Sequence, residues 1–143
     1  MNQGFTLIEI LLVLGIISIL TVGAVSVFLV FRPSLQLGGA VQELIGDLRY
    51  AQQSAITEQK EYCLQFWPVE KKYYLKKCDG EIIKEKKFPS EIISLNVNGF
   101  TNNEIRYNPY GAVKEAGSII LENIEKRQKT ISIKPSGFIS LSD

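Results

Sequence analysis

The chain has 143 residues, and 16 Lys and Arg residues stand against 15 Asp and Glu residues, so its formal charge is close to zero. That balance argues against a globally basic nucleic-acid binder, although a local basic patch stays open. Histidine is missing from the sequence, and the two cysteines are too few for a structural zinc site. We therefore expect a protein that is not an enzyme, with no metal and no cofactor.

The N-terminal region is dominated by an apolar segment. Residues 10–31 carry no formal charge, and a helix of this length spans roughly 33 Å, enough to cross the hydrocarbon core of a bilayer. A secretory signal peptide would instead show a basic start, a shorter apolar core and a small-residue cleavage site. We therefore expect a retained membrane helix. Glu9 lies directly before this segment, at its N-terminal end. An ionisable group in a membrane segment indicates a functional site.

The residues around this carboxylate form a specific motif. The run Gly4-Phe5-Thr6-Leu7-Ile8-Glu9, directly before the apolar segment, resembles the N-terminal signature of type IV pilins and type II secretion pseudopilins. The resemblance implies that a prepilin peptidase cleaves between Gly4 and Phe5 and methylates the new amine of Phe5. Residues 1–4 would then be a leader peptide.

Glu9 has two interpretations. In a filament of packed helices its carboxylate could pair with the Phe5 amine of a neighbouring subunit, and breaking such a buried pair typically costs ~3–5 kcal/mol. The alternative is a solvated carboxylate at the level of the lipid headgroups.

The leader has no Lys or Arg and Arg32 follows the helix, so the charge distribution does not support the orientation that the family implies.

Two helical segments are expected before a β domain. The first, over residues 5–33, is the membrane and filament-core helix, and Pro33 is expected to kink or restart it. The second, over residues 34–60, is amphipathic. Its apolar positions recur every three or four residues and are expected to pack on a sheet: Leu37, Val41, Leu44, Ile45, Leu48, Ala51, Ala55 and Ile56.

From residue 61 the apolar pattern alternates with a period of two, and turn signals recur to the end of the chain. This predicts strands near residues 62–67, 73–78, 81–86, 92–97, 104–107, 118–122, 130–134 and 138–141. The expected fold class is therefore α+β. A long N-terminal helix would pack on an antiparallel β head over residues 61–143.

The two cysteines fall in the first two predicted strands. If Pro68 faces Tyr73 across the turn, Cys63 faces Cys78, and opposed residues of a non-hydrogen-bonded pair lie about 4.5 Å apart at Cα, within disulfide range. We predict a cross-strand disulfide, which needs an oxidising compartment. A slip of one residue in the turn would leave two buried thiols instead.

A second resemblance covers the C-terminal third. The runs at residues 104–111, 117–121 and 131–139 are similar to the head of GspH/FimT-type minor pseudopilins and of the related ComGD-type competence pseudopilins. The resemblance implies a structural subunit of a pseudopilus that serves type II protein secretion. Its partners would be other pilins or pseudopilins, the prepilin peptidase and an inner-membrane assembly platform. It would cross the inner (cytoplasmic) membrane once, with the head in the periplasm or at the cell surface, before entering the filament.

The alternative function is a competence or type IV pilus subunit whose head binds DNA. Some FimT-type relatives bind DNA through basic residues near the C-terminus, but residues 136–143 contain no Lys or Arg. A different basic patch comprises Lys71, Lys72, Lys76 and Lys77, and its phosphate binding would depend strongly on salt. The other interpretation is that these lysines form the solvated edge of a hairpin.

Overall fold

The computed structural model describes residues 6–142, except for the side chain of Ser26. The chain divides into two units that meet between Arg32 and Pro33, and each unit is described by itself. One helix, α1 (Leu7–Glu58), contributes to both. Pro33 lies inside this helix and does not restart it. Proline removes one backbone hydrogen bond, and the helical bonds on either side keep the element continuous.

The second unit contains the hydrophobic core. Its part of α1 presents one apolar face to the strands, as the helical spacing predicts. The buried helix residues are Leu37, Ala40, Val41, Leu44, Ile45, Leu48, Ala51 and Ala55. Ile56, expected in the same stripe, remains 40% exposed, because it lies in the last turn before the helix ends at Glu58.

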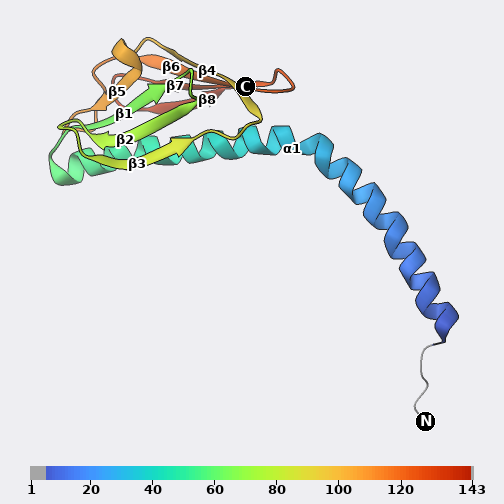
Figure 1. Ribbon diagram of the computed structural model, residues 1–143. Coiled ribbons are helices and arrows are strands. Elements are labelled where there is room, and N and C mark those ends of the chain that lie inside the picture. The colour runs from blue at the N-terminus through green and yellow to red at the C-terminus, as the bar shows by residue number, and fades with distance from the viewer. Residues whose placement is uncertain (1–5, 143) are drawn as a thin grey trace. The chain divides into compact units, whose positions relative to one another are not determined.

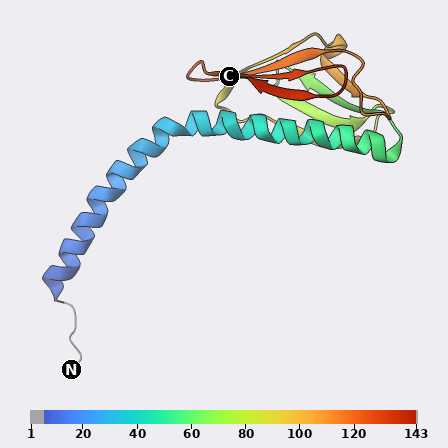
Figure 2. The same cartoon turned by 180° about the vertical axis from the view of Figure 1, so that it is seen from behind.

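Eight strands follow the helix and form two antiparallel sheets of four strands each (Figure 1). The first sheet has the order β3-β2-β1-β5 and the second has the order β4-β6-β7-β8. Seen from behind, the C-terminal strand β8 lies at the outer edge of the second sheet (Figure 2). The strands are β1 (Tyr62–Trp67), β2 (Lys72–Lys77), β3 (Ile82–Lys87), β4 (Ile92–Asn98), β5 (Glu104–Tyr107), β6 (Gly117–Asn123), β7 (Gln128–Ile133) and β8 (Ile139–Ser142).

The register of the first hairpin differs from the predicted one. Trp67 pairs with Lys72, and Cys63 pairs with Lys76 rather than with Cys78. The shift arises in the turn, where the amide of Lys71 donates to the carbonyl of Pro68 over 3.2 Å. Lys71 has a positive φ of 50°, a conformation that the sequence does not indicate because it is uncommon for lysine. The expected pairing of Pro68 with Tyr73 is therefore wrong.

Polar contacts join the helix to the edge strand β3. This strand has no buried residue, so apolar packing contributes little to its position. Instead, Lys84 Nζ lies 2.8 and 2.9 Å from the two carboxylate oxygens of Asp47, and Lys86 Nζ lies 2.7 Å from Glu43 Oε1. Asp47 and Glu43 thus hold the edge of the first sheet against α1.

A second contact joins the helix to two loops. The Gln52 side chain donates from Nε2 to the carbonyl oxygen of Gly111 over 2.8 Å. Gly137 lies beside this hydrogen bond, because a Cβ there would meet both the Gln52 side chain and the Gly111 carbonyl. Gly137 has φ +80, which L residues adopt rarely. The position therefore needs glycine for its backbone conformation and for space.

Candidate functional site

The start of α1 holds Glu9 in a defined place. Thr6 precedes the helix, and its hydroxyl oxygen accepts a hydrogen bond from the Glu9 amide over 3.3 Å. Thr6 is therefore the N-cap and Glu9 is the third helical residue, the spacing of a capping box. A carboxylate is favoured in the first turn by the helix dipole. Gly4 and Phe5 lie outside the described residues, so the cleavage site and the N-methylated amine stay predictions.

The helix that follows presents apolar side chains to its surroundings. Every residue from Leu7 to Phe31 whose burial is described is exposed, and the segment is long and apolar enough to cross a membrane. Two of its hydroxyl groups bond within the helix: Ser18 and Thr21 donate to carbonyl oxygens four residues earlier, over 2.8 and 2.7 Å. In the sequence, Glu9 is the only charged residue between positions 6 and 31.

The disulfide between Cys63 and Cys78 is present, with 5.3 Å between the two Cα atoms. It joins neighbouring strands diagonally, because Cys63 pairs with Lys76 and Cys78 follows the end of β2. The Cys78 amide donates to the Glu61 carbonyl over 3.0 Å and extends the pairing of the two strands. The predicted disulfide is therefore confirmed, although its register is two residues from the expected one.

Each lysine of the predicted basic patch has a partner within the head. Lys71 Nζ donates to the carbonyl oxygen of Ile92 over 2.9 Å. The other three lysines pair with carboxylates, which raise the pKa of Lys72 and Lys77. Much of the positive charge is therefore balanced locally, and DNA binding stays a prediction. The pairs are Lys72 with Glu70 (2.5 Å) and Glu85 (3.7 Å), Lys76 with Glu104 (3.0 Å), and Lys77 with Glu58 and Glu81 (3.2 Å each).

Sequence reasoning missed a pocket beside β5. Its charged residues are Glu104, Arg106, Lys114 and Glu115, and the short helix η1 (Thr101–Asn103) lies at its edge. Strand alternation could have indicated that Glu104 and Arg106 share a face, because Ile105 and Tyr107 are buried. No sequence pattern places residues 114 and 115 beside them. Within residues 6–142, no group of three or more His, Cys, Asp or Glu residues is arranged to hold a metal ion.

Comparison with known proteins gives two family matches. The family described as type II transport protein GspH matches residues 40–137, and the prokaryotic N-terminal methylation motif matches residues 1–25. No curated protein matches the chain.

The fold is shared with solved structures, among them those of two minor pilin-like proteins. The type IV minor pilin FimU of Pseudomonas aeruginosa is 14% identical, with a TM-score of 0.64, over 79% of this chain and 92% of that one. The minor pseudopilin EpsH from the type 2 secretion system of Vibrio cholerae is 11% identical, with a TM-score of 0.64, over 75% of this chain and 96% of that one. At these identities the likeness shows the fold alone.

A capped apolar helix that continues into a β head, together with the matched N-terminal methylation motif, defines a pilin-like protein. Because the GspH match covers more than half of the chain, the particular family is also settled. The chain belongs to the GspH family of type II transport proteins, which are structural pseudopilin subunits.

Proposed function

We propose that this chain is a minor pseudopilin of a type II secretion pseudopilus and that it assembles through the N-terminal half of α1. The observation that carries the proposal is a helix that exposes apolar side chains along its length and holds one carboxylate, Glu9, in its first turn. Such a surface needs lipid or other helices around it. A prepilin peptidase would cleave after Gly4 and methylate Phe5, as the matched methylation motif supports.

The role of Glu9 follows from its surroundings. A carboxylate among packed apolar helices is unfavourable unless a cation pairs with it. The amine that cleavage would leave on Phe5, four positions before Glu9 in the sequence, is such a cation, and a neighbouring subunit would supply it. Glu9 therefore selects the register in which each new subunit joins the filament. The partners are other pseudopilins, the peptidase and the inner-membrane assembly platform.

The location of the head follows from the disulfide. The Cys63–Cys78 bond needs an oxidising compartment, so the head lies outside the cytoplasm, in the periplasm or at the cell surface. The apolar helix crosses the inner membrane once before assembly. The function is structural, and we assign no enzymatic activity to the chain.

The test separates assembly from processing and insertion. Glu9→Leu should be cleaved after Gly4 and recovered with membranes like the wild type, yet be missing from sheared pseudopili. Glu9→Gln has nearly the volume of the native side chain and no charge, so it should fail in the same way if the charge is what matters. Glu9→Asp, which keeps the charge, is the matched control and should retain part of the incorporation. Normal incorporation of Glu9→Leu would exclude the proposed role of this residue.

A further inference from the structure

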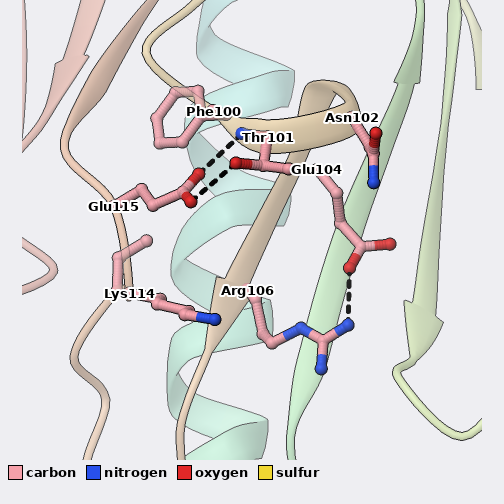
Figure 3. Close-up of a pocket in the computed structure, with 8 residues that line it drawn as sticks. Phe100, Thr101, Asn102, Glu104, Arg106, Lys114 and Glu115 are labelled. Carbon is pink, nitrogen blue, oxygen red and sulfur yellow. Dashed lines mark hydrogen bonds and ion pairs between the residues drawn. The ribbon is translucent and has the colours of Figure 1, made fainter.

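The pocket beside β5 opens on the face of the first sheet that points away from the core. Glu104 and Arg106 lie on this face because they alternate with the buried residues Ile105 and Tyr107. The opposite wall is the segment around Lys114 and Glu115, before β6 (Figure 3). The cavity has a volume of about 260 Å³, which suits one side chain from another protein rather than a folded segment.

The carboxylates of the pocket already have donors. Glu115 accepts a hydrogen bond from the Thr101 amide over 2.6 Å and another from the Thr101 hydroxyl over 2.7 Å. Glu104 accepts from Arg106 Nη2 over 2.9 Å and pairs with Lys76 over 3.0 Å. The bonds from Thr101 lower the pKa of Glu115. At Glu104 burial raises the pKa, but the contacts with Arg106 and Lys76 together outweigh burial, so the pKa is lowered. Both carboxylates are therefore already bound by groups of the head itself.

The two positively charged side chains of the pocket, Lys114 and Arg106, still have N–H donors that could bind a ligand. Lys114 makes no hydrogen bond or ion pair within 4 Å with another described residue, and its charge interacts only at longer range with Glu115, whose pKa it helps to lower. In Figure 3 its ammonium group points toward the Arg106 side chain. Arg106 uses Nη1 for Glu61 and Nη2 for Glu104, but a guanidinium group carries five N–H donors. Two positive side chains thus line the same cavity, and an anion bound there would be attracted by both.

We propose that this pocket receives the carboxylate of an Asp or Glu side chain from the head of a neighbouring pseudopilin, an inference that rests on the proposed filament function. A single carboxylate fits the volume and can accept from the N–H groups that Arg106 does not use for Glu61 and Glu104. A polyanion such as DNA gains less, because Glu104 and Glu115 offset the two cations over longer distances. The outer face of an edge strand is also a place where a packed head can approach.

Zero-length crosslinking of assembled filaments tests this contact. A carbodiimide joins a lysine amine to a carboxylate only where the two groups touch. In pseudopili that contain the full-length wild-type chain, mass spectrometry should find Lys114 bonded to an Asp or Glu of another subunit. Lys114→Arg keeps the charge but cannot form this amide, so it should enter filaments normally and lose the crosslinked peptide.

A charge-reversal variant of Lys114 is the second test of the proposed contact. Lys114→Glu should reduce incorporation roughly tenfold or more, because it places like charges across the contact. Lys126→Glu, an exposed lysine in the turn between β6 and β7, is the control and should incorporate as the wild type does. The pocket proposal fails if wild-type filaments form without a Lys114 crosslink to another subunit, or if Lys114→Glu incorporates normally. Failure of the wild-type chain to enter pseudopili would overturn the proposed function as well, and with it the contact.

Discussion

The hydroxyl of Tyr73 donates a hydrogen bond to Asp47 Oδ2 over 2.5 Å, which joins the centre of the first sheet to α1. Tyr73 is buried, and Lys84 binds the same carboxylate from the edge strand. Burial, and then the bond to Asp47, raise the pKa of the Tyr73 hydroxyl. One carboxylate on the helix thus organises two neighbouring strands.

Removing this hydroxyl should destabilise the head. Tyr73→Phe leaves the ring in the core but takes one donor from a charged acceptor, a change that typically costs ~1.5–3 kcal/mol. Tyr74→Phe is the matched control, because its hydroxyl bonds to Glu85 over 3.1 Å at an exposed site, and it should change stability by less than about 0.5 kcal/mol. Urea unfolding of residues 33–143, which contain the whole buried core, measures both. Equal effects of the two variants would contradict the role of Asp47.

The disulfide should account for a large share of the stability of the head. Cys63 and Cys78 are 15 residues apart, and closing a loop of this size is worth ~3 kcal/mol through the entropy of the unfolded chain. The double variant Cys63→Ala/Cys78→Ala should therefore unfold at a markedly lower urea concentration than the oxidised protein. Reductant should shift the wild type in the same direction and leave the double variant unchanged. A reductant effect on the double variant would show that the shift has another cause.

The secondary structure was largely predictable because it depends on local patterns. The change in apolar period at residue 61 separates helix from strands, and turn residues mark most strand ends. The disulfide between Cys63 and Cys78 was predicted correctly, but from a hairpin register that is two residues from the observed one. The helix stripe was predicted up to Ile56, which is partly exposed since it lies where the helix ends.

The division into two sheets, the hairpin register and the pocket depend on contacts that are distant in sequence. Lys71 takes a left-handed conformation that no local signal marks. Lys76 looked like part of a basic patch, but Glu104, 28 positions along the chain, neutralises it. Glu115 meets Thr101 only because the loop before β6 returns to η1. Local sequence patterns cannot show which distant groups come together.

Two glycines should respond to alanine with opposite signs. Gly137→Ala puts a Cβ against the Gln52 amide and the Gly111 carbonyl at a positive φ, so it should destabilise the head by ~1–3 kcal/mol. Gly46 lies in α1 with open space around its Cα, and Gly46→Ala should stabilise the helix by up to ~1 kcal/mol. Thermal unfolding of residues 33–143 measures both, and destabilisation by Gly46→Ala would contradict the open space at that position.

Acid should weaken the head through the carboxylate of Glu115. Its backbone hydrogen bond from Thr101, and then the hydroxyl bond from the same residue, lower its pKa below the ordinary 4.5. Because its pKa is lower in the folded state than in the unfolded state, the ionised carboxylate stabilises the folded head above pH 4.5. This stabilisation is lost as the pH falls through the folded-state pKa. Glu115→Gln should therefore be less stable than the wild type at pH 7, and the difference should shrink toward pH 3. Thr101→Ala keeps the backbone donor and should retain part of this pH dependence. Urea midpoints from pH 7 to 3 give the comparison, and a constant difference at all pH values would exclude titration of Glu115 as the cause.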